Sequence, residues 1–506
     1  MSIYVDGENL SIKDVHDVSR RDERVEIAEV CKEKIERSRK VVEDKLEGDE
    51  DVYGINTGFG DLANVKIENE KTQQLQKNLI RSHASGVGEP LAEDVVRATI
   101  LLRANTLVKG YSGIRLKVIE LLVDMLNEGI HPVMPCKGSV GASGDLAPLA
   151  HMSLVLMGEG EAFYDGEKLS GEEALNRAGL KPVELKAKEG LALVNGTQVM
   201  TGIGALIVHD GKRLLKAAQI AGAMSLEALE GTDAVFDCRI HQIRPHQGQI
   251  ECAENLRKLT NNSEIIESHK DCDKVQDPYT LRCMPQVYGA TKDALSYVEK
   301  VLKIEMNSAN DNPLVFPDGD VISGGNFHGQ PVALALDYLA SAISEIGDIS
   351  ERTTDKLMYE EESGLPRFLS EKEGVNSGFM IAQYTAAALV SENKVLTHPA
   401  SVDSIPTSAG QEDHVSMGSI SARQAEEVLE NVENVVAIEL MSAAQGLEFH
   451  DKNPGIGVRI AYDHLRKNVD ALEQDRSLSD DIEKTRNIII EGDLIEEVED
   501  EVGILE

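Results

Sequence analysis

Residues 138–151 form a glycine-rich segment, GSVGASGDLAPLAH, in which one serine could do several kinds of chemistry. Ser143 could cap a helix that begins near Leu146, because a serine before a helix can accept a hydrogen bond from its first amides. Glycines before a helix could also cradle a phosphate, but the Gly-Lys-Ser/Thr ending of a P-loop is missing. The segment is not the G-x-S-x-G elbow of a hydrolase either, since Gly144 follows Ser143 directly. Taken alone, it predicts a capped turn.

A second segment, residues 276–286, reads QDPYTLRCMPQ and places an aromatic and a basic side chain together. Asp277 is predicted as the N-cap of a helix and Pro278 as its first residue. Tyr279 and Arg282 are then three residues apart and lie on one face of that helix. An arginine placed in this way can bind a carboxylate through two hydrogen bonds, although an isolated arginine is ordinarily a surface residue.

Five further residues lie in loops or near helix ends, and each has a structural interpretation when taken alone. Tyr53 can pack at the edge of a glycine-rich loop, and Asn195 can form a turn with the glycine that follows it. Phe327 can anchor a core, and Glu412 can complement the dipole at the start of a helix. His83 can be a structural histidine whose nitrogens are satisfied locally.

The elements that must position these residues are mostly helices. Long runs of strong helix formers carry apolar residues at helical spacing. These runs cover residues 22–46, 203–230, 284–306, 330–351, 378–395 and 417–446. Strand signals are few and short, at residues 3–5 and 314–316. The predicted fold class is therefore mainly α, with long helix bundles and a few short strands.

At 506 residues the chain exceeds the size at which a single core stops growing, so more than one lobe is expected. We predict an N-terminal lobe over residues 1–197, which carries the Ala-Ser-Gly segment. A C-terminal lobe built from long helices is predicted over residues 198–506. Its acidic end, residues 479–506, is expected to form a peripheral helix or a partly mobile tail.

Composition excludes several classes of partner. The net charge is −37, from 88 acidic and 51 basic residues, so neither nucleic acid nor an anionic membrane is an expected partner. No stretch approaches the roughly 18–20 apolar residues of a membrane helix, and the first ten residues do not resemble a signal peptide. The expected location is the cytoplasm, where the six scattered cysteines stay free thiols. No motif has metal-ligand spacing, so no metal is expected.

Residues 138–151, read as one string, closely resemble the signature of the aromatic amino acid ammonia-lyase family. In that family Ala-Ser-Gly cyclises on itself to 4-methylidene-imidazol-5-one (MIO), so no external cofactor is expected. Carried onto this chain, the amide nitrogen of Gly144 attacks the carbonyl carbon of Ala142, and loss of two waters turns Ser143 into a methylene. Alanine and glycine lack the bulk that would block this backbone approach, and Asp145 is expected to help the dehydration. The resemblance covers most of residues 3–475 and implies the fumarase/aspartase-like superfamily architecture.

The resemblance also implies roles for loop residues elsewhere. Residues 52–60, VYGINTGFG, match the family's base-bearing loop, so Tyr53 is expected to be the general base. Because an unperturbed tyrosine titrates at about pH 10, this role requires a lowered pKa. Asn195 is expected to bind the electrophile or the substrate carboxylate, and Phe327 to pack near the electrophile.

Two further motifs match the family. The spacing Gln-x-x-Tyr-x-x-Arg implies that Arg282 holds the substrate carboxylate, with Gln276 and Tyr279 in support. The motif QEDH makes Glu412 a site acid. Gly410 departs from the family pattern, in which Asn is expected, and this departure puts the local loop geometry in question.

The expected substrate depends on His83, in the string RSHASG. This position selects the substrate ring in the family: tyrosine-specific relatives tend to have His-Leu there and phenylalanine-specific relatives Phe-Leu. An imidazole nitrogen buried without a partner costs about 1–3 kcal/mol, and His83 can supply a partner, with Glu412 as a second polar group. L-Histidine is therefore the expected substrate, with trans-urocanate and ammonia as products.

Several alternatives stay open at this point. The same electrophile can act on tyrosine or phenylalanine, in a lyase or a 2,3-aminomutase. A fumarase-like lyase is disfavoured, because residues 284–286 match only a fragment of its Gly-Ser-Ser-x-Met-Pro-x-Lys loop. A helical scaffold with a dead site is disfavoured because Tyr53, Asn195 and Arg282 are all present. The family further implies a homotetramer whose sites draw residues from three chains.

Overall fold

The computed structural model describes the chain except for residues 1, 49–50, 59–66, 69–70, 271–274 and 373. By its internal contacts the chain divides into two compact units. The first comprises residues 1–209, 298–337 and 399–423, and the second comprises residues 210–297, 338–398 and 424–506. Contacts do not say which stretch of chain folds independently, so the lobes expected at 1–197 and 198–506 stay a prediction.

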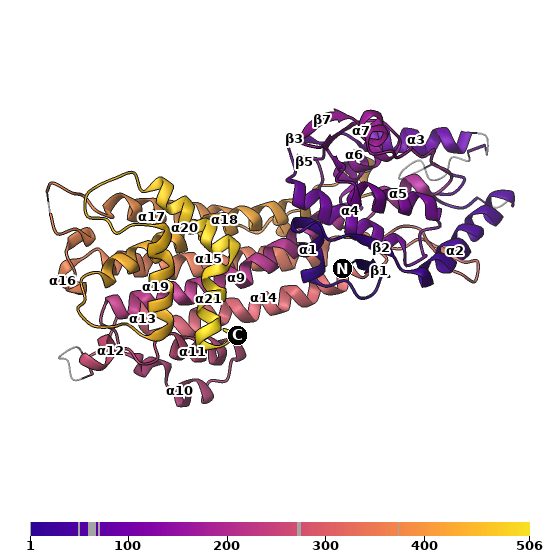
Figure 1. The fold of residues 1–506 in the computed structure, drawn as a ribbon. Helices are drawn as coiled ribbons and strands as arrows, with labels where there is room; N and C mark the ends of the chain where they lie inside the picture. Colours follow the sequence, from indigo (N-terminus) through magenta and orange to yellow (C-terminus); the bar gives the residue numbers. More distant parts are fainter. Residues whose placement is uncertain (1, 49–50, 59–66, 69–70, 271–274, 373) are drawn as a thin grey trace. The chain divides into compact units, whose positions relative to one another are not determined.

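Helices dominate both units, and the predicted mainly α class is confirmed (Figure 1). Four long helices contribute residues to both units: α9 (Gln198–Ala228), α14 (Met284–Met306), α15 (Gln330–Leu357) and α18 (Gly418–Leu447). The other α-helices of the second unit are α10 (Cys238–Gln242), α11 (Gln247–Leu259), α12 (Glu264–Ser268), α13 (Tyr279–Arg282), α16 (Glu360–Ser363), α17 (Met380–Leu396), α19 (Ile456–Asn468), α20 (Ser479–Glu491) and α21 (Asp493–Val502).

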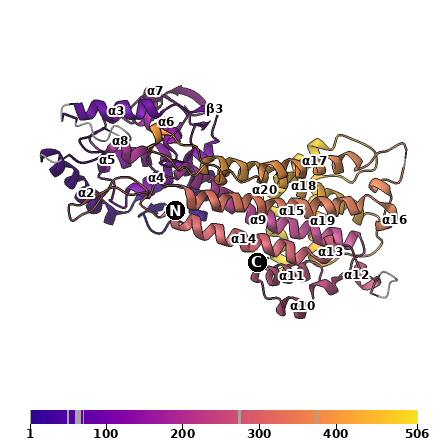
Figure 2. The same ribbon diagram turned by 180° about the vertical axis from the view of Figure 1, so that it is seen from behind.

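Within the second unit the long helices lie side by side, as both views show (Figure 2). The buried carboxylate of Glu439 on α18 accepts hydrogen bonds from Ser225 of α9 and Ser350 of α15. Tyr288 of α14 donates to the carbonyl of Ala218 on α9, at 3.2 Å. Buried polar links of this kind fix the register of helices whose apolar faces alone would allow sliding.

The first unit contains shorter helices and all the described strands. Its α-helices are α1 (Ile12–Arg20), α2 (Glu29–Glu47), α3 (Thr72–His83), α4 (Glu93–Leu107), α5 (Leu116–Asn127), α6 (Leu146–Leu156), α7 (Gly171–Arg177) and α8 (Glu189–Val194). The strands form four small sheets, in the orders β1-β2, β3-β5, β4-β6-β7 and β8-β9. They are β1 (Ile3–Val5), β2 (Val25–Ile27), β3 (Val87–Pro90), β4 (His131–Pro132), β5 (Pro135–Lys137), β6 (Glu161–Tyr164), β7 (Glu167–Ser170), β8 (Leu314–Val315) and β9 (Val321–Ile322).

Helix α4 is the centre of the first unit, since every residue from Val95 to Leu107 is buried. A helix buried on every side is typical of a core, yet this one includes two buried arginines, Arg97 and Arg103. Buried cations need polar partners, and the partners of these two arginines are different.

The single helix predicted over residues 22–46 is wrong at its start. Val25–Ile27 form β2, which pairs in parallel with β1 through Ile3↔Val25 and Val5↔Ile27, and α2 begins only at Glu29. The short Val-Glu-Ile alternation suits a strand once a partner is available, so pairing overrides the helical periodicity.

The acidic end of the chain is helical. Helices α20 and α21 bury Ile488, Ile489 and Val498, and Leu505 beyond them is buried too. Of the two expectations, the peripheral helix is therefore the one observed. Among the described residues no helix is long and apolar enough to span a membrane.

Candidate active site

The Ala142-Ser143-Gly144 segment lies in a loop between β5 and α6. The expectation that Ser143 caps α6 is wrong, because Asp145 holds the N-cap position and makes no side-chain cap bond. Instead, the Ser143 hydroxyl donates to Oε1 of Glu412, at 3.3 Å. Ala142 packs in a small apolar cluster with Val415. The serine hydroxyl thus faces a carboxylate while its neighbour is anchored in the interior.

A second backbone segment backs this loop. Gly144 and Gly196 form a parallel β-bridge, in which the amide of Gly196 donates to the Ser143 carbonyl at 3.2 Å. The amide of Asp145 donates in turn to the Gly196 carbonyl at 2.7 Å. Gly144 has a φ of +74°, and a Cβ there would overlap the Gly196 carbonyl oxygen. Only glycine permits both this conformation and this approach.

Asp145 fastens the loop to two long helices. Its fully buried carboxylate accepts hydrogen bonds from the amides of Val199 and Met200, at 2.9 and 3.0 Å, and from the hydroxyl of Ser419, at 2.6 Å. Burial raises the pKa of Asp145 to about 6, although these three hydrogen bonds oppose the shift. Its position at the start of α9 is favourable for a negative charge.

A cavity of about 570 Å³ opens beside the serine, lined only by residues of the first unit. Six of the predicted site residues line it together: Tyr53, Ala142, Ser143, Asn195, Phe327 and Glu412. Sequence reasoning missed the others, which are Asn312, Ser323, Gly324, His328, Gln411, Asp413 and His414.

Tyr53 reaches the cavity from a loop that the core holds in place. Ile55 is fully buried in a cluster with Val42 and Val315, and the amide of Val52 donates to the Asn56 side chain at 2.7 Å. Because residues 54–58 are buried, the loop presents the half-buried Tyr53 from a fixed base. The end of the matched motif, Phe59-Gly60, lies outside the described residues.

Asn195 is buried at the back of the cavity. Its side-chain amide donates to the carbonyl of Asn312 at 2.9 Å and lies 3.5 Å from Oδ1 of Asp311. Asp311 is itself paired with Lys188 at 2.6 Å, and neither side chain has exposed surface. This buried ion pair orients the asparagine and was not signalled by any motif.

Glu412 is held by a compact loop rather than by a helix start. Thr407 donates through its hydroxyl to Oε2 of Glu412 at 2.9 Å, and the two residues also form an antiparallel bridge. Ser408, Ala409 and Gly410 all have positive φ, with +89° at Gly410. Because glycine and asparagine are the residues that best tolerate this region, the departure from the family's Asn is compatible with the loop.

His83 ends α3 and does not itself line the cavity. Its Nδ1 lies 2.8 Å from the Leu79 carbonyl, so this nitrogen carries the proton and Nε2 is the acceptor in the neutral ring. Burial lowers the pKa of His83, while the bond to Leu79 and the charge of Glu412 act in the opposite direction. A neutral histidine with one acceptor nitrogen results.

Gln276, Tyr279 and Arg282 belong to the second unit and form a cluster of their own. Arg282 donates to the Gln276 side chain at 2.6 Å and stacks on the Tyr279 ring, which is 73% exposed. The predicted proximity of Tyr279 and Arg282 is confirmed. The predicted cap is wrong: Pro278 is the N-cap of α13, and Asp277 instead accepts from the amide of Thr232.

Among the residues that sequence reasoning missed, two histidines form a defined pair. The rings of His328 and His414 stack at 5.7 Å with an angle of 8°. Nδ1 of His328 accepts from the amide of Gln330, so its Nε2 carries the proton that reaches the His414 carbonyl at 3.1 Å. His328 directly follows Phe327 and His414 is the last residue of the motif QEDH, and this adjacency to predicted site residues was the available signal.

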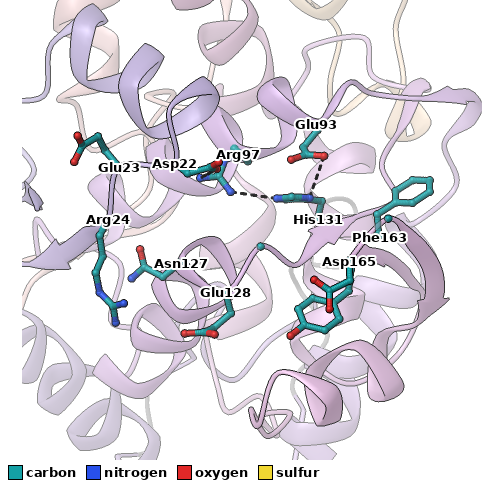
Figure 3. A pocket seen from close by; sticks show the side chains of 13 residues that line it. Asp22, Glu23, Arg24, Glu93, Arg97, Asn127, Glu128, His131, Phe163 and Asp165 are labelled. Atoms are coloured by element: carbon teal, nitrogen blue, oxygen red, sulfur yellow. Dashed lines mark hydrogen bonds and ion pairs between the residues drawn. The ribbon is translucent and has the colours of Figure 1, made fainter.

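The first unit has another cavity, of about 530 Å³, with a charged lining (Figure 3). Arg97 donates there to the carbonyls of Val18 and Leu126 and lies 3.2 Å from Nε2 of His131. It also pairs with Asp22 at 2.9 Å, and His131 faces Glu93 at 3.5 Å (Figure 3). These groups satisfy one another, so we assign them a structural role. In the part of the chain that the structure describes, no group of three or more His, Cys, Asp or Glu could hold a metal ion.

Comparison with known proteins gives a consistent result. The model of the family described as aromatic amino acid lyase matches residues 10–467. A histidine ammonia-lyase of Alkaliphilus oremlandii is 57% identical over 504 residues, which are 99% of each chain. One of Gloeobacter violaceus is 56% identical over 507 residues, covering 100% of this chain and 99% of the relative.

Solved structures agree with these relatives. The histidine ammonia-lyase of Trypanosoma cruzi superposes with a TM-score of 0.92 at 41% identity, over 99% of this chain and 95% of that one. A tyrosine aminomutase of Streptomyces globisporus gives a TM-score of 0.95 at 38% identity, over all of both chains. The superfamily architecture expected from the sequence is therefore confirmed.

Proposed function

Since the chain belongs to the aromatic amino acid lyase family, we propose that it is a carbon–nitrogen lyase that eliminates ammonia from L-histidine to give trans-urocanate. One observation carries this proposal above the others. Ser143 lines a cavity, and the residue after it, Gly144, has a backbone conformation and a close neighbour that only glycine permits. Curated relatives 51–57% identical over nearly the whole chain are named histidine ammonia-lyase, which supports histidine as the substrate.

The residues present fit an electrophile made from the backbone. Cyclisation to MIO needs an amide nitrogen that can approach a carbonyl two residues earlier, and a hydroxyl that can leave. Gly141 and Gly144, on either side of Ala142 and Ser143, have φ values of +70° and +74°, which favour glycine. The Ser143 hydroxyl points to Glu412 instead of capping α6. When formed, this group supplies the electrophile that makes ammonia a better leaving group.

Side chains around the cavity take the remaining tasks. Tyr53 and the buried Asn195 both line the cavity. We propose that Tyr53 accepts the β-proton of the substrate as general base and that Asn195 binds the electrophile or the substrate carboxylate. Phe327 contributes an apolar wall. Loss of the Ser143 hydroxyl on ring closure releases Oε1 of Glu412, which is then available to a polar group of the substrate.

His83 does not line the cavity itself, but the charge of Glu412, which does, acts on it, and we infer that the tautomer of His83 contributes to histidine specificity. Its Nδ1 is committed to the Leu79 carbonyl, and its Nε2 can accept one hydrogen bond. A substrate imidazole can donate that bond, whereas a phenyl ring leaves the nitrogen unsatisfied at a cost of about 1–3 kcal/mol. The charge of Glu412 acts on His83, so both groups can serve one substrate ring.

A homotetramer with shared sites accounts for the second group of predicted residues. Arg282 and Tyr279 are accessible on the second unit. In a tetramer they could bind the carboxylate of a substrate that lies in the cavity of another subunit. Exposed apolar side chains on α14, α15 and α17 support association. They are Tyr297, Tyr338, Ile381, Tyr384 and Val395. Co-refolding inactive Tyr53→Phe and Arg282→Ala chains should then restore part of the activity, and a fully active monomer would contradict this assembly.

The substrate is tested by separate incubation with histidine, tyrosine and phenylalanine. Each conjugated acid product has its own ultraviolet absorption, so one spectrophotometer distinguishes the three reactions. We expect urocanate from histidine at a rate far above the other two. Faster turnover of tyrosine or phenylalanine would overturn the substrate while leaving the electrophile intact. The protein is further proposed to act in the cytoplasm, as expected for an enzyme of amino acid breakdown.

A further inference from the structure

The backbone at Asn195-Gly196 determines how tightly the Ala142-Ser143-Gly144 loop is closed. Two hydrogen bonds, Gly196 N to Ser143 O and Asp145 N to Gly196 O, fasten the two segments on both sides of Gly144. No space for a Cβ is left between Gly144 and Gly196. Any retreat of Gly196 would therefore let Gly144 relax away from the Ala142 carbonyl that its nitrogen must reach.

Arg103 of α4 holds that segment from behind. Its side chain has no exposed surface, and its Nη1 donates both to the Asn195 carbonyl and to Oε1 of Gln198, the latter at 2.9 Å. A Cβ on Gly196 would lie only 2.6 Å from Nη1, so the guanidinium is packed directly against the segment. Gln198 is fixed in turn by Asn310, at 2.8 Å.

Burying the Arg103 guanidinium for this contact is energetically unfavourable, because the charge is removed from water. A buried cation ordinarily has a carboxylate in direct contact, but the nearby Asp311 is bonded to Lys188. The Nε and Nη2 atoms of Arg103 have no hydrogen-bond partner among the described residues. Burial lowers the pKa of Arg103 to about 10, and Asp311 opposes this. A side chain that served only to fill the core would be apolar.

We propose that Arg103 is a positioning residue for the cyclisation of Ala142-Ser143-Gly144, acting through Asn195-Gly196; this rests on the proposed electrophile. In the step itself, the Gly144 nitrogen bonds to the Ala142 carbonyl carbon. The carbonyl oxygen leaves as water with the amide hydrogens of Gly144 and Ser143, and a C=N bond forms. The Ser143 hydroxyl leaves as a second water with the α-hydrogen, which creates the methylene. No oxidant or reductant is needed.

The test compares two buried arginines of one helix. Arg103→Met removes the contact to Asn195, whereas Arg97→Met removes another buried guanidinium, whose polar partners are Val18, Leu126, Asp22 and His131. The readouts are intact mass, which reports the loss of two waters, and Tm, which reports the fold. We expect Arg103→Met to be folded with most of its chains at the unmodified mass. Arg97→Met should lose Tm to a similar extent and still complete the ring.

Arg103→Lys keeps the charge, but its shorter side chain cannot bring an ammonium to the position of Nη1 against both Asn195 and Gln198, so its ring should form several times more slowly after refolding. This variant decides the matter if Arg103→Met is insoluble. Ring formation at the wild-type rate in Arg103→Met or, failing its recovery, in Arg103→Lys would overturn the proposal, as would equal loss of the ring in Arg97→Met. A wild-type chain that never loses two waters would instead refute the electrophile itself, so the two failures are distinguishable.

Discussion

Two cavities of the first unit have nearly the same volume, about 570 and about 530 Å³, yet only one of them is arranged for chemistry. In the charged cavity, Arg97, His131, Asp22 and Glu93 are paired in a way that no reaction alters. In the cavity beside Ser143, the contact to Glu412 depends on a hydroxyl that the proposed ring closure would remove. The difference teaches that neither volume nor buried charge marks an active site. The distinguishing feature is the contact between Ser143 and Glu412, because the proposed reaction would remove the serine hydroxyl that makes it.

Changing one side chain in each cavity tests most directly whether only the cavity beside Ser143 supports activity. Ser143→Ala removes the leaving hydroxyl, so kcat for histidine should fall by at least about a thousandfold, or about 4 kcal/mol, with Tm little changed. Asp22→Asn weakens a pair whose carboxylate is largely exposed, so activity should remain near that of the wild type. Steady-state kinetics and thermal melts measure both. Comparable activity losses in the two variants would erase the distinction.

His83→Leu should have the next largest effect. Removal of the acceptor Nε2 should lower kcat/KM for histidine roughly 10- to 100-fold, corresponding to one unsatisfied hydrogen bond in a buried site. The variant should gain activity toward phenylalanine relative to histidine, because a leucine suits a phenyl ring. His131→Gln in the charged cavity is the matched control and should leave both rates unchanged. An unchanged histidine preference in His83→Leu would remove this residue from substrate recognition.

Thr407→Val should have a smaller effect on the same cavity. The variant keeps the shape of the side chain but loses the hydrogen bond to Oε2 of Glu412, so kcat should fall roughly 5- to 10-fold, or about 1–1.5 kcal/mol. Thr407→Ser keeps the hydroxyl and should recover most of the activity. If valine and serine variants behave alike, the hydroxyl does not position Glu412.

The smallest expected effect concerns His131 in the charged cavity, which should change the pH dependence of stability but not the activity. Burial lowers the pKa of His131; Glu93 opposes this shift, Arg97 adds to it, and Asp22 opposes it. The unfolded chain therefore binds this proton at a higher pH than the folded chain, so the free energy of unfolding falls as pH drops below the unfolded pKa of about 6.5. His131→Gln should lose less Tm than the wild type between neutral pH and pH 5. Parallel losses would show that His131 does not titrate in this way.

The long helices and six of the thirteen residues that line the cavity could be predicted because each rests on local sequence. Helix α14 follows its predicted bounds from Met284 to Met306, since helical periodicity is legible over many residues. The strand β2 could not be predicted, because three residues become a strand only when β1 lies beside them. Asp277 carried every sign of a helix cap but is bonded to Thr232, a residue distant in sequence.

The supports of the site were harder to predict than the site. Tyr53, Asn195 and Glu412 lie in motifs. Arg103 instead contacts the backbone carbonyl of Asn195, and Lys188 contacts the buried carboxylate of Asp311. An arginine inside an apolar helix does signal a buried partner, but the partner comes from another segment of the chain. Sequence spacing carries no information about such contacts between distant segments.

The intact mass of the denatured wild-type chain, measured beside Ser143→Ala, tests the central claim most directly. If the electrophile forms from Ala142-Ser143-Gly144, the wild type should be two waters lighter than its encoded mass, and the variant should have its encoded mass. A wild-type chain at its full encoded mass that still converts histidine to urocanate at the full rate would contradict the account.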